Sequence, residues 1–149
     1  MDLNYLLSEG NSFYEVNKKD VDILQSKLDF PVPESLVELW EKIGYGFVYS
    51  DNCRINRIMD PLSLMDFRFR QGDFESYSDI EIYSRHEKDK LIFFESDENA
   101  YISIGFDSEN LGKIFYYGVE IASSLEEFLM KLSQDDLYFL DVFNNSISH

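Results

Sequence analysis

The sequence predicts an α+β domain in which an antiparallel sheet of about five to six strands packs against helices near both ends of the chain. Apolar residues recur at helical spacing before residue 44 and after residue 124, and the stretch between carries short runs of Ile, Phe and Tyr bounded by Asp, Asn and Ser. The 149 residues, 44% of them hydrophobic, can bury one core, and no Pro/Gly/Ser-rich linker or repeat divides them. We therefore expect a single domain over residues 1–149.

The first expected helix covers residues 17–28. Its apolar side carries Val21, Leu24 and Leu28. Asn17 and Asp20 are placed to cap its amino end, because their side-chain oxygens can accept hydrogen bonds from the unpaired N–H groups of the first turn. This pattern predicts a surface helix with one buried face.

The second expected helix begins at Pro33 and ends at Gly44. Proline suits a helix start because its φ is fixed near the helical value and it lacks an N–H that the first turn would leave unpaired. The residues that recur at i, i+3, i+4 and i+7 are Leu36, Leu39, Trp40 and Ile43. Gly44 can close the helix in a left-handed conformation. Trp40 is therefore expected in the core rather than in a ligand-stacking site.

Five strands and three more helices are expected after Gly44. The strands are residues 47–49, 54–59, 90–95, 100–105 and 112–117. Asp60, followed by Pro61, has the chemistry of a helix start, and Ser124 with Glu127 forms a capping box. Residues 136–143 are apolar enough to dock as a last helix, and residues 144–149 are expected to fray.

Taken in order, these segments resemble the SUKH superfamily over residues 15–132. The resemblance rests on the Pro-opened helix ending in Gly44-Tyr-Gly46, the helix before it, the three late strands and the Ser124-Leu-Glu-Glu-Phe-Leu129 helix start. The sequence departs from the pattern at Asn99-Ala-Tyr101, where many members carry a glycine before an aromatic. The resemblance implies a binding module without chemistry: members are best known as bacterial immunity proteins that neutralise a cognate toxin, often a nuclease, and fungal members regulate cell-wall synthesis.

The formal net charge is −16, from 29 acidic and 13 basic residues. A field of this sign repels phosphate backbones and anionic membranes, so neither nucleic acid nor a membrane is an expected partner. The charge is explained either by solubility alone or by a basic protein partner whose encounter it accelerates. The oligomeric state stays open.

Location follows from what the chain lacks. Cys53 is the one cysteine, which rules out an intrachain disulfide and favours a reducing compartment. The amino terminus has no basic region and apolar run of a secretory signal, and no apolar run reaches the ~20 residues of a membrane span. We expect the protein in the cytoplasm.

Catalytic and metal-binding motifs are weak. The two histidines are His86, in an expected loop, and His149, at the chain end. Cys53 is expected to be a small core residue rather than a nucleophile. The turn from Asp107 resembles a calcium loop only superficially, because Gly118 stands where a bidentate Glu is needed. Paired carboxylates follow from composition alone. We expect no enzyme, no cofactor and no metal site.

Residues 68–89 are polar, dense in charge and interleaved with aromatics, and we expect an exposed excursion there. Tyrosine combined with charge is typical of interfaces, and a turn after the next strand can extend the acidic patch. The expected partner-binding residues are Asp73, Glu75, Tyr77, Asp79, Glu81, Tyr83, Asp97 and Glu98. The alternative is a solvated loop with a short edge strand over residues 80–83.

The leading hypothesis is therefore an immunity-type protein that neutralises a cognate toxin, expected to be a basic nuclease domain, by stoichiometric binding. Two alternatives stay open. One is a regulatory or scaffold protein of the same fold with a different partner. The other is an uncharacterised hydrolase, which would need carboxylates or His86 converging in a cleft.

Overall fold

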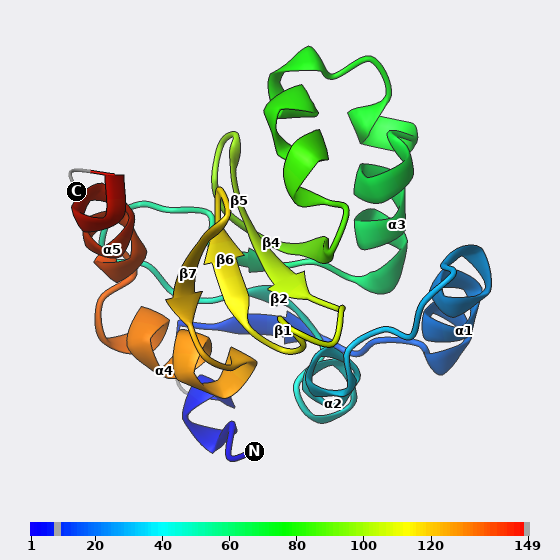
Figure 1. Ribbon diagram of the computed structural model, residues 1–149. Helices are drawn as coiled ribbons and strands as arrows, with labels where there is room; N and C mark the ends of the chain where they lie inside the picture. Colours follow the sequence, from blue (N-terminus) through cyan, green and yellow to red (C-terminus); the bar gives the residue numbers. More distant parts are fainter. Residues whose placement is uncertain (8–9, 148–149) are drawn as a thin grey trace.

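The computed structural model describes residues 1–7 and 10–147 and confirms the α+β class. Its centre is an antiparallel sheet of seven strands whose spatial order follows the chain (Figure 1). The strands are β1 Ser12–Tyr14, β2 Tyr45–Phe47, β3 Arg57–Ile58, β4 Lys90–Asp97, β5 Ala100–Gly105, β6 Ile114–Tyr116 and β7 Val119–Ala122. Five to six were expected, and the two that the sequence did not indicate, β1 and β7, form the edges.

Helices pack on both faces of this sheet. The α-helices are α1 Lys18–Lys27, α2 Glu34–Lys42, α3 Pro61–Phe69, α4 Leu125–Gln134 and α5 Tyr138–Ile147; the 3-10 helices are η1 Asn4–Leu7, η2 Gly72–Phe74 and η3 Ser78–His86. On one face, Phe67 of α3 contacts Tyr101 of β5, with ring centroids 4.7 Å apart. On the other, Phe128 of α4 contacts Phe94 of β4 at 5.2 Å. No helix in the described part of the chain is long and apolar enough to cross a membrane.

The expected helix starts are confirmed at three caps. The side chain of Asn17 accepts a hydrogen bond from the Lys19 N–H. The side chains of Asp60 and Ser124 likewise accept hydrogen bonds from the N–H groups of Ser63 and Glu127. In the last case the Glu127 carboxylate accepts from the backbone N–H of Ser123, one residue before the position that a capping box predicts.

Helix α2 buries the face that its periodicity predicts. Pro33 is the residue just before its first turn, and its carbonyl oxygen accepts the Leu36 N–H at 3.0 Å. Trp40 is 2% exposed, and its indole Nε1 donates to the Met59 carbonyl oxygen at 2.9 Å. Trp40 is therefore a core residue whose polar atom is also satisfied, as buried indoles require.

The Gly44-Tyr-Gly46 turn joins α2 to the sheet. Gly44 has φ +107° and Gly46 has φ +135°, and both are buried. A Cβ would lie 2.0 Å from the Tyr14 carbonyl oxygen at Gly44 and 2.1 Å from that of Ser12 at Gly46. Glycine is needed at both positions so that β1 can approach β2 closely enough to pair.

Several local expectations were wrong. The strand expected over 47–49 lies two residues earlier as β2, and the one expected over 54–59 shortens to β3, because Asn56 has φ +48° and interrupts it. Cys53 is exposed in a turn, not in the core. Residues 144–147 continue α5 instead of fraying, since Phe143 packs on Tyr116 with ring centroids 5.2 Å apart; residues 148–149 lie outside the described part of the chain.

Candidate protein-binding surface

Residues 72–86, which we call the cover, contain η2 and η3 joined by residues 75–77, not the loop or the edge strand over 80–83 that the sequence suggested. A 3-10 helix has three residues per turn, so every third side chain shares a face. Ile80 and Tyr83 form the inner row of η3 and are 0% and 1% exposed. Asp79, Ile82 and Arg85 form the outer row and are exposed. The segment is therefore an ordered, half-buried cover on the sheet that presents one polar face outward.

Two tyrosine hydroxyls tie this cover to the β4–β5 turn. Tyr83 donates to the Asn99 carbonyl oxygen at 2.8 Å and accepts the Tyr101 N–H at 3.0 Å. Tyr77 donates to Asn99 Oδ1 at 2.7 Å. Asn99 has φ +60°, a conformation that asparagine tolerates better than most residues and that suits this tight turn. Burial raises the pKa of Tyr83, so its hydroxyl stays a donor.

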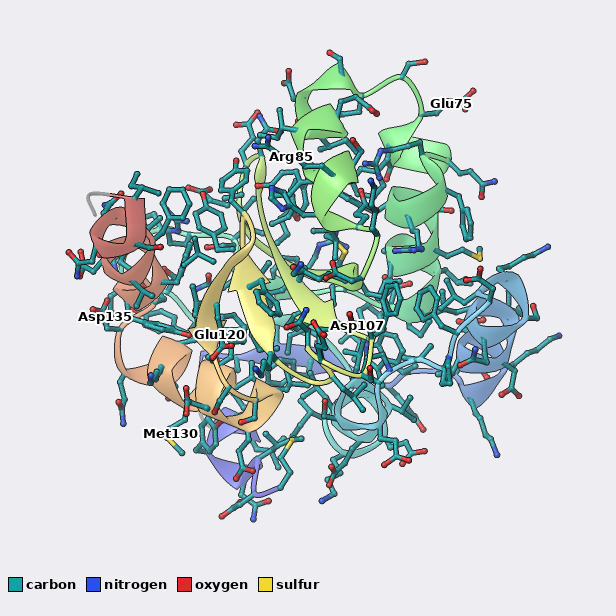
Figure 2. The ribbon with its side chains drawn as sticks, viewed as in Figure 1. Glu75, Arg85, Asp107, Glu120, Met130 and Asp135 are labelled. Carbon is teal, nitrogen blue, oxygen red and sulfur yellow. The ribbon has the colours of Figure 1, made fainter. Side chains whose placement is uncertain are left out.

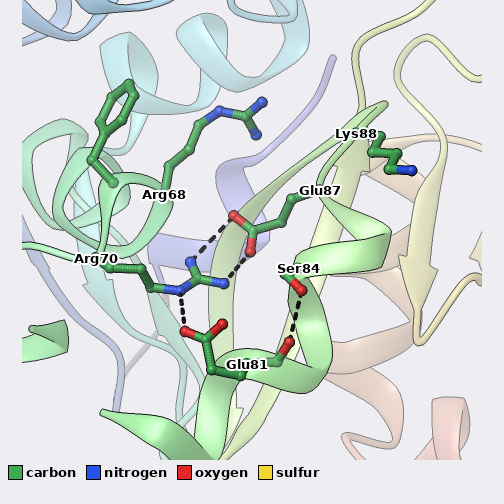
Figure 3. A pocket seen from close by; sticks show the side chains of 7 residues that line it. Arg68, Arg70, Glu81, Ser84, Glu87 and Lys88 are labelled. Carbon is green, nitrogen blue, oxygen red and sulfur yellow. Dashed lines mark hydrogen bonds and ion pairs between the residues drawn. The ribbon is translucent and has the colours of Figure 1, made fainter. Parts of the chain in front are cut away.

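An arginine clamp holds the other end of the cover. Arg70, in the left-handed conformation after α3, places its guanidinium between two carboxylates, 2.5 Å from Glu87 and 3.3 Å from Glu81 (Figure 3). Burial raises the pKa of Glu87, and the hydrogen bond and positive charge of Arg70 oppose this without reversing it. The neighbouring hollow, lined by Arg68, Ser84 and Lys88 among others, has these paired groups at its centre. Its charges serve to fix η3 against α3.

The eight expected interface residues fall into three groups. Four carboxylates are exposed and, within residues 1–7 and 10–147, form no ion pair: Asp73, Glu75, Asp79 and Glu98. We call these four the acidic surface, and Figure 2 shows Glu75 pointing away from the body. Glu81 and Asp97 are instead paired, with Arg70 and Arg54. Tyr77 is half-buried. Tyr83 is buried and therefore cannot touch a partner in this structure.

Ile82 is a surface residue that the sequence pattern did not single out. Its side chain is 52% exposed, one 3-10 turn after Asp79. An apolar side chain within a polar rim is the arrangement found at the centre of protein interfaces. The three-residue spacing separates Ile82 from Tyr83 only once residues 78–86 are known to form a 3-10 helix, which the sequence pattern did not indicate.

A second polar cluster surrounds Asp136, between α4 and α5. Its carboxylate is 5% exposed and accepts hydrogen bonds from Ser50, from Asn52 Nδ2 at 2.6 Å and from Asn56 Nδ2 at 2.8 Å. Burial alone raises the pKa of Asp136, but these three donors outweigh it and hold the pKa below its ordinary value. An ionised carboxylate bound by neutral donors is suited to fixing the 50–56 loop, not to transferring a proton.

We expect Asp136→Asn to lower the free energy of unfolding near pH 7 by about 1–3 kcal/mol, because the amide cannot accept all three donors. A lowered folded-state pKa stabilises the fold above the unfolded pKa of about 3.9 and loses that contribution as pH falls below it. The difference between wild type and variant should therefore shrink below about pH 4. Urea unfolding across this range measures it, and a difference that did not vary with pH would contradict the assignment.

No group of three or more His, Cys, Asp or Glu side chains in the described residues is placed to hold a metal ion. His86 packs its ring against Tyr117 at 6.3 Å, and burial and the positive charges of Arg85 and Lys90 lower its pKa. Cys53 is exposed on its turn. The described residues thus place neither His86 nor Cys53 in a constellation with a base or an orienting acid.

The structure is an α+β domain of the kind that the SUKH resemblance implies, with the Gly-x-Gly turn as the junction between helix α2 and the sheet. The chain belongs to the SMI1 / KNR4 family (SUKH-1), whose family profile matches residues 15–131. It is 43% identical over 146 residues to "Immunity protein YxxD" of Bacillus subtilis (strain 168), an alignment that covers 97% of this chain and 99% of that protein. No solved structure matches it significantly.

Proposed function

We propose that this protein is an immunity protein that neutralises a cognate toxin by binding it in a stoichiometric complex. The observation that carries the proposal is the 43% identity to a named immunity protein across nearly the full length of both chains. The identity extends along nearly all of both sequences, so the likeness is not confined to one segment of the fold. Family membership over residues 15–131 supports the same conclusion.

The acidic surface supports a basic partner. Asp73, Glu75, Asp79 and Glu98 lie on the cover and on the adjoining β4–β5 turn, which Tyr77 and Tyr83 tie together. Unpaired carboxylates on a chain of net charge −16 attract cationic surfaces and accelerate their encounter. A nuclease toxin needs such a cationic surface to bind phosphates, so covering that surface would block its substrate. We therefore propose a basic nuclease domain as the partner.

Binding alone is sufficient for this function. Asp136 is ionised and fully engaged, and the clamp around Arg70 is internally paired. The four carboxylates of the acidic surface are exposed to solvent and not enclosed in a shielded site. A general acid needs a raised pKa in a shielded site. We propose that the protein acts as an inhibitor and not as an enzyme.

The test is to co-express the full chain with the product of the neighbouring gene and to titrate that product's toxic activity with purified protein. We expect a complex of equal stoichiometry by light scattering, and activity that falls linearly to zero at one equivalent. Inactivation by a small fraction of an equivalent would indicate catalysis. Failure to form a complex, with another protein captured instead, would favour the regulatory alternative.

A further inference from the structure

Four aromatic side chains share one face of the β1–β2 pair. Tyr45, Phe47 and Tyr49 alternate along one strand and its extension, so they point to the same side. Tyr14 lies directly opposite Tyr45 in the register, with ring centroids 5.5 Å apart, and Ser12 lies opposite Phe47. We call Tyr14, Tyr45, Phe47 and Tyr49 the aromatic face.

This face is open to solvent. Tyr14 is 54% exposed, Phe47 43% and Tyr49 60%. Single exposed aromatics are ordinary, but several grouped on one sheet face are typical of interaction surfaces. Tyrosine and phenylalanine contribute large contact areas at low entropic cost, which makes them frequent binding hot spots.

The strand register places the aromatic face on the same side of the sheet as the cover. Phe47 lies opposite Arg57, Arg57 opposite Glu95, and Glu95 opposite Tyr101. Partners in an antiparallel register point to the same side. Tyr101 lies under Phe67, so the row runs from the open aromatic face to the base of α3 and the cover. One partner could therefore contact both the aromatic face and the acidic surface.

The middle of this row is already neutralised. Arg57 Nε lies 3.1 Å from Glu95 Oε1, and the Tyr101 hydroxyl lies 3.4 Å from the same carboxylate's Oε2. Beside the row are two exposed acids, Glu15, which directly follows Tyr14, and Asp51, which lies two residues after Tyr49. A cation approaching the rings would meet negative charge at the edge of the aromatic face. A second copy of this chain, also at −16, would be repelled.

We propose that the aromatic face binds arginine side chains of the basic protein that the acidic surface attracts. Arginine is favoured over lysine here because its planar guanidinium stacks on aromatic rings in addition to the cation–π attraction. The chain itself uses this contact: the Arg68 guanidinium lies 5.0 Å from the Phe30 ring centroid and 5.5 Å from that of Phe106. The identity of the partner rests on the proposed function, whereas the preference of the aromatic face for arginine does not.

The preference for arginine is tested by titrating the full chain with oligo-arginine and oligo-lysine peptides of equal length. Binding is observed by ¹H–¹⁵N NMR. We expect the backbone amides of Tyr14, Phe47 and Tyr49 to shift more with the arginine peptide. A triple threonine variant, Tyr14→Thr, Phe47→Thr and Tyr49→Thr, keeps strand propensity and should lose that preference. Equal shifts with both peptides in the wild type would overturn the proposal.

The biological contact is tested with the neighbouring gene's product. The triple threonine variant should bind it at least about tenfold more weakly, whereas the control Leu111→Thr with Met130→Thr, at exposed apolar sites elsewhere, should bind within about twofold. Equal weakening in both variants, or none in either, would contradict a role for the aromatic face. If the wild type bound no such product, the proposed function would fail while the peptide experiment still decided the chemistry.

Discussion

Replacing Trp40 with alanine is expected to lower the free energy of unfolding by about 3–5 kcal/mol, as for other large buried aromatics. The side chain is 2% exposed, so its removal leaves a cavity where α2 meets the sheet. The Met59 carbonyl oxygen also loses the indole donor that lies 2.9 Å away. Both effects destabilise the fold. Urea unfolding followed by circular dichroism measures the change.

The matched control is Met130→Ala on α4, where the side chain is 40% exposed and points outward (Figure 2). That substitution should change stability by no more than about 0.5 kcal/mol. A Trp40→Ala protein that kept its melting temperature and lost only partner binding would show that Trp40 is a surface anchor, contrary to its burial in this structure.

Reversing the charge at Asp73, Glu75 and Asp79 with lysine is expected to weaken binding of the toxin partner at least about tenfold, a loss of about 1.4 kcal/mol. These carboxylates are exposed and unpaired, so the change should leave the fold intact. Glu81 is left unchanged because reversing it would break its ion pair with Arg70. The association rate of the wild type should fall as salt rises, since ions screen exposed charges beyond about 8–10 Å.

A control with the same net charge separates local contact from the overall field. The substituted acids are Asp22 of α1, Glu41 of α2 and Glu109 of the β5–β6 turn, all exposed. If the acidic surface is the interface, this control should weaken binding much less than the first variant. Equal weakening would mean that net charge alone steers the partner, and unchanged affinity in a folded first variant would move the interface elsewhere.

Local chemistry in the sequence determined most helices and the charge. Pro33, Asn17, Asp60 and Ser124 each satisfy or remove the unpaired N–H groups of the turn that they begin, so a few neighbouring residues suffice to mark the start. The stripe that carries Trp40 predicts its own burial because a helix needs one apolar face. The −16 balance is likewise a property of composition.

Only the tertiary structure decided where the strands pair and which residues of the cover are exposed. β1 exists because Gly44 and Gly46 admit the backbone of Ser12–Tyr14 at a distance that no Cβ would allow. Tyr83 and Ile82 are adjacent, yet one is buried on Asn99 and Tyr101 and the other faces solvent. Cys53 is exposed on a loop whose Asn52 and Asn56 side chains are bound by Asp136, at least eighty residues away. Contacts between residues so distant in sequence leave no local periodicity, so they are established only once the chain has folded.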